Sequence, residues 1–265
     1  MMNDDEANVP LDDDDEEEYT PPDWLTPAHQ RLRYLVREYY RAQRARIRAA
    51  HYLRRLEARD VEPSRLKLFV ADQKESQLWE GRRSREIAKS LADFAVGPRL
   101  AALRGIGPVL AGGWIGELGP ADRFAHPSAV WKYCGLSVGK DGWTIHAEEG
   151  EKRPFSRALK TLAWKTSKSF VMTDGPYRAF YDRRKRREED RKDWIAERLR
   201  ERRKLAPEKE LKGVQAYIDA RAKRWTVKLF LSHLWHNSRE MEGKPTVTPW
   251  IIGQGGHADI IPPPW

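Results

Sequence analysis

The sequence of this 265-residue chain predicts an all-α protein. Apolar residues recur at every third or fourth position over long stretches, which is typical of amphipathic helices. Prolines that suit a first helical turn, such as Pro27 and Pro108, open some of these stretches, and glycine–proline pairs interrupt others. We expect a long N-terminal helical hairpin, a helix-hairpin-helix module, and C-terminal helices with an irregular glycine-rich loop.

Two long helices are predicted first. Thr26 is expected to cap a helix that continues to about Ala58, and residues 61–64 interrupt the pattern. Ser64 is expected to cap a second helix that continues through Phe94 and ends at Gly97-Pro98. Helices joined by so short a break form an antiparallel hairpin or coiled coil, so residues 27–95 are also a candidate surface for a homodimer.

The remainder is predicted to be helical apart from one loop and the tail. Helices are expected at about 127–134, 155–173, 176–205 and 207–241, with a loop between Gly135 and Arg153 that has room for one short β-hairpin. The predicted domains are a disordered acidic tail (1–24), the helical hairpin (25–96), the helix-hairpin-helix domain (97–175), a basic helical extension (176–242) and an extended Pro/Gly-rich tail (243–265).

The most specific pattern lies between Leu100 and Ala111. Gly105 suits the left-handed conformation that ends a helix, and Ile106 is expected to fill the core between the two helices of the hairpin. Gly107 has no side chain, so it would leave the backbone accessible to a ligand. The free N–H groups at the start of the next helix would then point toward an anion such as a phosphate. The small residues Ala111, Gly112 and Gly113 would let the two helices of the hairpin approach closely. The alternative is a tight connection between two helices, without a ligand.

Charge is distributed unevenly. The chain has 49 Lys and Arg against 40 Asp and Glu, but its first 24 residues hold eleven of the acids and no Lys or Arg. Residues 25–265 therefore have 49 basic and 29 acidic groups, a net charge of +20. Such an excess is typical of proteins that neutralise nucleic-acid phosphates. The acidic leader is interpreted as a disordered tail, or as a segment that competes with DNA for a basic surface.

A second basic element lies in residues 178–204, which hold thirteen Lys and Arg and seven Asp and Glu. This segment is either a solvated helix of alternating charge or a surface that follows a phosphate backbone. Together with the hairpin it supplies the candidate DNA-binding residues: Arg104, Gly105, Ile106, Gly107, Val109, Leu110, Lys140, Arg183, Arg184 and Lys185.

Several other classes of protein are excluded or disfavoured. The single cysteine, Cys134, excludes disulfide frameworks and multi-cysteine zinc motifs, and its apolar neighbours predict a buried thiol. The histidines are scattered, and Gly105 follows a helix and not a strand, so neither a metal site nor a nucleotide cofactor is expected. No apolar run has the length of a membrane span, which predicts a soluble, cytoplasmic protein without a membrane partner.

The residues after the glycine pair resemble a known family. Their pattern is similar to the C-terminal domain of insertion-sequence transposases of the IS-one-ten/one-sixteen/nine-oh-two class, and the chain resembles a short stand-alone subgroup. The residues that carry the resemblance are Gly105-Ile106-Gly107-Pro108, Glu117-Leu118-Gly119, Arg123-Phe124, His126-Pro127-Ser128, Tyr133, Gly135-Leu136, 155–159, Pro176-Tyr177, 221–235, Gly256-His257 and 261–264. This resemblance implies a role in DNA transposition or recombination, and it implies DNA or structured nucleic acid as the ligand.

The departures from this family concern catalysis. Residues 1–96 do not resemble the family's carboxylate nuclease domain, and Lys140-Asp141-Gly142 stands where its nucleophilic serine is expected. A carboxylate does not readily replace a serine hydroxyl as that nucleophile, and Ser137 is the nearest substitute. We therefore expect a DNA-binding protein whose catalytic residues are absent or supplied by a separate subunit, and the wider family adds guide RNA as a candidate partner. The alternatives are an active serine-type recombinase with an unrecognised nucleophile and a helical structural or interaction protein.

Overall fold

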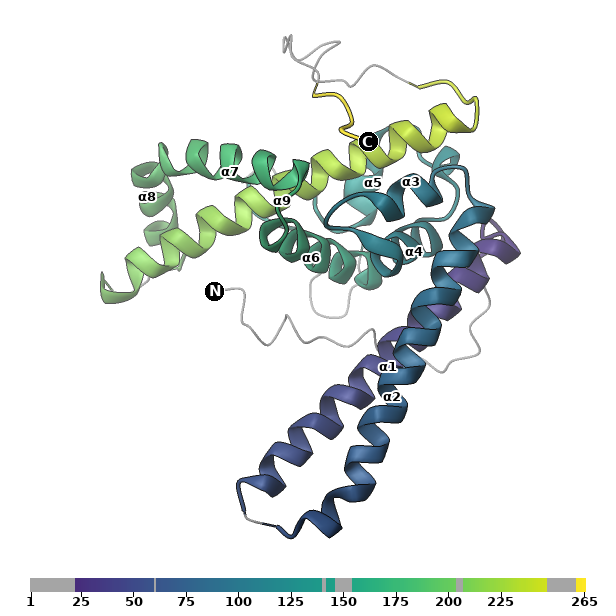
Figure 1. Cartoon of the computed structure of the whole chain (residues 1–265). Coiled ribbons are helices and arrows are strands. Elements are labelled where there is room, and N and C mark those ends of the chain that lie inside the picture. The colour runs from purple at the N-terminus through teal and green to yellow at the C-terminus, as the bar shows by residue number, and fades with distance from the viewer. Residues whose placement is uncertain (1–21, 60, 140–141, 146–153, 204–206, 247–260) are drawn as a thin grey trace. The chain divides into compact units, whose positions relative to one another are not determined.

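A computed structural model describes residues 22–59, 61–139, 142–145, 154–203, 207–246 and 261–265 (Figure 1). The described part of the chain is all-helical, which confirms the predicted fold class. In these residues the short β-hairpin expected after Gly135 is a single antiparallel bridge between Val138 and Thr144. The helices are α1 (Pro27–Glu57), α2 (Pro63–Ser90), α3 (Gly97–Ala102), α4 (Gly107–Leu118), α5 (Pro127–Tyr133), α6 (Arg157–Met172), α7 (Pro176–Glu189), α8 (Lys192–Arg203) and α9 (Pro207–Met241).

The helices form two compact units. One contains α1 to α4, from residues 22–102 and Gly107–Pro120. The other contains the turn Leu103–Ile106 and everything from Ala121 onward, hence α5 to α9. The chain therefore passes from the first unit to the second and back within the turn that joins α3 to α4.

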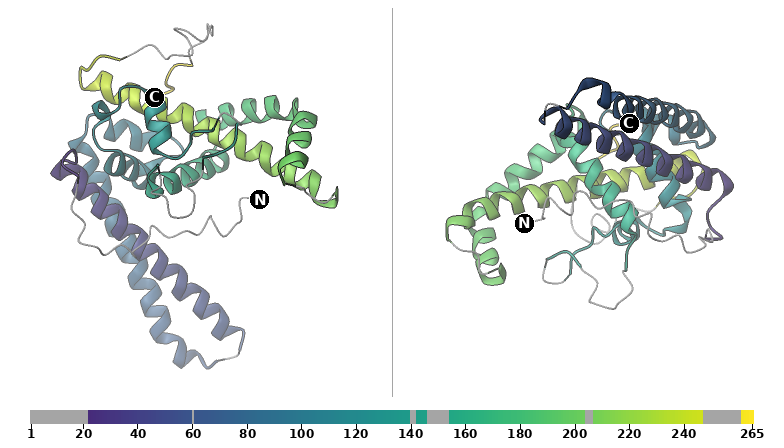
Figure 2. Two further views of the ribbon diagram at one scale, coloured as in Figure 1. Left: turned by 180° about the vertical axis from the view of Figure 1, so that it is seen from behind. Right: turned by 90° about the horizontal axis from the view of Figure 1, so that it is seen from below.

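In the first unit, α1 and α2 run antiparallel as a long hairpin (Figures 1 and 2). Thr26 caps α1, because its side chain accepts a hydrogen bond from the backbone N–H of His29. The expected cap of α2 is wrong. Pro63 takes the first helical position, so Glu62 precedes the helix and Ser64 lies within its first turn.

The expected continuation of α2 through Phe94 is also wrong. The α-helix ends at Ser90, a 3-10 turn follows at Leu91–Asp93, and Phe94 is extended. Gly97 then opens α3 instead of ending α2, and a Cβ atom on Gly97 would lie 2.0 Å from the carbonyl oxygen of Leu91. Only glycine allows so close an approach of the two backbone segments.

Helix α4 packs on α1 and α2 through its small residues. A Cβ atom on Gly112 would lie 2.6 Å from Cγ2 of Ile87, and one on Gly116 would lie 2.9 Å from the backbone nitrogen of Arg33. The Arg33 side chain also forms an ion pair with Glu117 at 3.0 Å. We expected Gly112 to let the two helices of the helix-hairpin-helix approach each other. In the structure, Gly112 instead lets α4 approach α1 and α2.

In the second unit, α5, α6, α7 and α8 each pack against the long helix α9. Phe170, Tyr177 and Phe230 form its aromatic centre, with the rings of Phe170 and Tyr177 stacked at 4.5 Å. The charged segment that the sequence treats as one helix turns after Glu189, so that Ile195 and Leu199 of α8 pack on Val214 and Ile218 of α9.

The last residues of the chain pack on the same unit. The side-chain amide of Asn237 donates to the carbonyl of Trp265 at 3.0 Å, and the indole N–H of Trp265 donates to the Tyr177 hydroxyl at 3.1 Å. Of the tail that the sequence predicts to be extended, residues 247–260 lie outside the described residues. Cys134 is fully buried, and burial raises the pKa of its thiol. Within the described residues, none of the helices combines the length and apolar character that crossing a membrane requires.

Candidate nucleic-acid interface

The turn between α3 and α4 contains two glycines in the left-handed region. Gly105 has φ of +97° and Gly107 has φ of +65°, values that side chains with a Cβ atom adopt only with strain. Ile106 lies between them and is only 6% exposed, and its N–H donates to the carbonyl of Leu103 at 2.9 Å. The turn is thus built from two unusual backbone positions around one buried side chain.

The two glycines face different surroundings. A Cβ atom on Gly105 would lie 3.0 Å from the ring of Phe170, so this position packs against α6. A Cβ atom on Gly107 would meet no atom within 4 Å. Gly107 is the first residue of α4, and Pro108 has no N–H, so the amides of Gly107 and Val109 precede the first intrahelical hydrogen bonds. The backbone of Gly107 is therefore open on the side where the helix carries its partial positive charge.

The loop that precedes Gly107 is fixed by the turn between α6 and α7. A Cβ atom on Gly175 would lie 3.1 Å from the carbonyl oxygen of Arg104 and 3.4 Å from the Cβ atom of Arg104. Arg104 itself is exposed. The candidate residues Arg104, Gly105 and Ile106 are thus adjacent along a loop whose backbone is held in place.

The basic run on α7 is divided between exposed and inward-facing side chains. Arg183 is exposed and lies 5.8 Å from the ring of Phe180, and Lys185 lies 6.0 Å from the ring of Tyr181. Arg184 instead forms an ion pair with Glu188, a residue that is only 1% exposed. Arg184 therefore neutralises a buried carboxylate, whereas Arg183 is accessible to a ligand.

Glu188 is held by two arginines. Besides Arg184, the Arg221 side chain donates to the Glu188 carboxylate at 2.6 Å. Burial by itself would raise the pKa of Glu188, but the two guanidinium groups outweigh it and hold that pKa below its ordinary value. The group is a buried, charged link between α7 and α9.

The residues expected near a catalytic position lie in and around the loop after α5. Ser137 is half-buried and precedes Val138, which forms the bridge with Thr144. Lys140 and Asp141 lie outside the described residues. Ser128 lies in the first turn of α5, which His126 caps. The ring nitrogen Nδ1 of His126 accepts from the N–H of Ala129 and lies 2.8 Å from the Ser128 hydroxyl.

Arg224 and Lys228 on α9 are not among the residues that the sequence pattern predicts to bind a ligand. Arg224 donates to the hydroxyl of Thr144 at 3.2 Å, and Lys228 lies 5.2 Å from the ring of Trp131. Both side chains are half-buried. The available signal was a pair of cations four residues apart within residues 224–231, a stretch of α9 that is otherwise mostly apolar.

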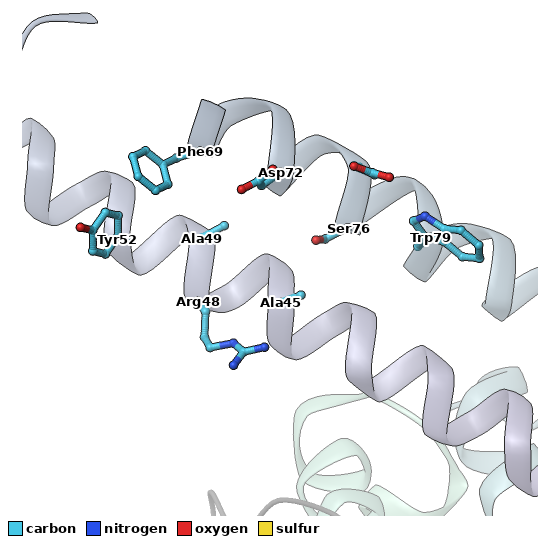
Figure 3. Close-up of a pocket in the computed structure, with 9 residues that line it drawn as sticks. Ala45, Arg48, Ala49, Tyr52, Phe69, Asp72, Ser76 and Trp79 are labelled. Atoms are coloured by element: carbon cyan, nitrogen blue, oxygen red, sulfur yellow. The ribbon is translucent and has the colours of Figure 1, made fainter. Parts of the chain in front are cut away.

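The α1–α2 hairpin has an open groove of about 470 Å³ between the C-terminal half of α1 and the N-terminal half of α2 (Figure 3). Ala45, Ala49 and Tyr52 line it from α1, and Phe69, Ser76 and Trp79 line it from α2. Charged side chains border it as well, with Arg48 on α1 and Asp72 and Glu75 on α2. Leu68 and Leu78, both 66% exposed, lie on α2 near these residues in sequence.

Among the described residues, no group of three or more His, Cys, Asp and Glu side chains is arranged to hold a metal ion. Comparisons of the chain with known protein families and with curated protein sequences gave no match.

Proposed function

We propose that this chain binds DNA by its phosphate backbone through the turn that contains Gly105 and Gly107, and that it is related to the insertion-sequence transposases it resembles. The observation that carries the proposal is the open backbone of Gly107, which has positive φ, starts a helix and has no neighbour within 4 Å of a Cβ position. A phosphate oxygen could approach the amides of Gly107 and Val109 there without displacing any side chain.

Two further features support this function. Residues 25–265 have a net charge of +20, which favours association with a polyanion and release of its counterions. Arg183 provides an exposed cation on α7, and Lys185 provides a half-buried one. Contacts of this kind position a protein on nucleic acid but read little sequence, so we expect binding that depends weakly on base sequence. Catalysis, where it occurs, would come from a partner subunit.

The experiment compares two glycines that share a positive φ and an open Cβ position. Gly107 and Gly243 have φ of +65° and +67°, and neither has an atom within 4 Å of a Cβ position. Asparagine tolerates this conformation, so Gly107→Asn keeps the fold while its side chain covers the open backbone, and Gly243→Asn is the matched control.

Binding is measured by gel shift on linear and branched DNA over a range of salt concentrations. We expect Gly107→Asn to weaken binding to both DNAs and Gly243→Asn to bind like the unmodified chain. The affinity of the unmodified chain should fall steeply as salt rises. Equal affinities for the two variants, or affinity that stays constant with salt, would contradict the proposal.

A second candidate function, self-association, is favoured by the groove of the α1–α2 hairpin. A second copy related by a two-fold axis would bury Leu68 and Leu78 and bring Arg48 of one hairpin toward Asp72 and Glu75 of the other. Sedimentation equilibrium tests this. We expect a dimer that Leu68→Gln and Leu78→Gln dissociate, whereas Met172→Gln, at a residue that is 83% exposed on α6, leaves it intact. A monomeric unmodified chain would exclude this function.

A further inference from the structure

Two cations on one face of α9 lie beside the loop that follows α5. Arg224 and Lys228 are four residues apart, so their side chains are neighbours on the helix surface. Arg224 contacts the loop through its 3.2 Å hydrogen bond to the Thr144 hydroxyl. Lys228 lies over Trp131, whose indole N–H donates to the Lys228 carbonyl at 2.9 Å. Three segments of the second unit thus meet around two positive charges.

Glu188 on α7 and Asp219 on α9 already have partners. Glu188 is bound by Arg184 and Arg221. Asp219 forms an ion pair with Lys223 at 2.6 Å and accepts a hydrogen bond from the Tyr181 hydroxyl at 2.5 Å. Across the residues that the structure describes, no carboxylate forms an ion pair with Arg224 or Lys228. Among the described residues, these two half-buried cations therefore lack a carboxylate in ion-pair contact, and Glu188 acts on the Arg224 charge only at longer range.

That arrangement is unfavourable without an anion. Burial lowers the pKa of Lys228 to about 8, and the charge of Arg224 contributes to the shift. Burial also lowers the pKa of Arg224. Tyr217 and Glu188 oppose this effect and Arg221 adds to it, and the net shift is downward. A bound anion would offset both effects, because it would replace the lost hydration of the two cations and reduce the repulsion between them.

We propose that Arg224, Lys228 and Thr144 form a phosphate-binding site. Arginine offers a planar pair of N–H donors, lysine a compact positive charge, and a threonine hydroxyl can donate to a phosphate oxygen while it accepts from Arg224. The ligand is a phosphate group, either free or part of a nucleic-acid strand. This site uses none of the residues of the α3–α4 turn and does not depend on the DNA binding proposed for that turn.

The test is a titration of the full chain with sulfate by calorimetry at low ionic strength, because sulfate mimics phosphate and keeps its charge between pH 6 and 10. We expect saturable binding that Arg224→Gln and Lys228→Gln each weaken by about tenfold or more. Lys223→Gln is the matched control, since it removes the same charge from the same helix at a residue that is already paired with Asp219. Lys228→Arg keeps the charge and should retain binding.

A second measurement does not depend on the stability of the variants. Adding sulfate should raise the pKa of Lys228 above its value in the free protein, as followed by NMR of its side chain. Competition by a short oligonucleotide assigns the site to nucleic-acid phosphates, whereas competition by inorganic phosphate alone assigns it to a free phosphate. The Gly107→Asn variant should bind sulfate normally even where it fails to bind DNA. Absence of saturable sulfate binding, or equal binding by all variants, would overturn the site.

Discussion

Replacing Gly112 by alanine adds a methyl group at a point where α4, α1 and α2 meet. The new Cβ atom would lie 2.6 Å from Cγ2 of Ile87, 3.1 Å from Cδ2 of Leu32 and 3.2 Å from Cγ2 of Val36. Carbon atoms in contact normally lie about 3.5–4.0 Å apart. Ile87 and Leu32 are fully buried, and the Ile87 methyl is attached directly to its β carbon, so it can move away only by leaving its preferred χ1 rotamer or by a shift of its helix.

The expected cost follows from two opposing effects. Overpacking of a tightly packed core costs up to about 3 kcal/mol. Alanine in place of glycine inside a helix contributes about 1 kcal/mol of stability. We therefore expect Gly112→Ala to lower the free energy of unfolding by about 2 kcal/mol. Gly81→Ala in α2 is the matched control, because its Cβ atom would meet only an arginine nitrogen at 3.6 Å, and it should stabilise the protein by about 1 kcal/mol.

The assay is urea unfolding followed by circular dichroism, with hydrogen exchange of α1 and α4 peptides as a local measurement. The double variant Gly112→Ala with Ile87→Leu should recover part of the loss, because leucine has no methyl group on its β carbon. Stability of Gly112→Ala equal to or above that of the unmodified chain would refute the packing described for α4.

Three other predictions concern charge. Burial lowers the pKa of His233 from 6.5 to about 4, so between these pH values only the unfolded chain binds the proton. The free energy of unfolding should therefore fall by up to about 3 kcal/mol as the pH drops from 6.5 to 4. Denaturant titrations at several pH values should show that His233→Asn lacks this pH dependence. Glu188→Gln leaves Arg184 and Arg221 without their buried carboxylate, so it should destabilise the protein by about 3 kcal/mol, and a loss no larger than that of the surface variant Glu189→Gln would contradict this role. Deleting residues 1–18 removes ten acidic groups and should tighten DNA binding in the gel-shift assay, with a difference that shrinks as salt rises; unchanged affinity at low salt would show that the tail does not compete with DNA.

Much of the fold can be predicted from local signals. Thr26 caps α1 as expected, and α9 begins at Pro207 and ends at Met241, because apolar periodicity and terminal residues act within a few residues of the helix. The errors occur where local signals compete. Ser64 is a good cap by residue type, but Pro63 already fits the first helical turn. The end of α2 depends on the contact of Gly97 with the Leu91 carbonyl, which sequence spacing does not reveal.

The candidate site shows the same division. The glycine spacing predicts a turn with unusual backbone conformations, and Gly105 and Gly107 both have positive φ. Which of the two is open is decided by Phe170, which lies against Gly105 from a helix more than 60 residues away. The basic run on α7 likewise reads as uniform in sequence, yet Arg184 is committed to the buried Glu188.

The helical class, most helix positions, the basic character of residues 25–265 and the glycines that can take positive φ all follow from the sequence. They depend on composition and on interactions between residues close in the chain. Three arrangements appear only in the folded chain: the Gly112 face of α4 packs on α1 and α2, Glu188 is neutralised from two helices, and Arg224 and Lys228 contact Thr144 and Trp131. These arrangements depend on close packing and on the cost of burying charge, and both are set by residues that are distant in the sequence.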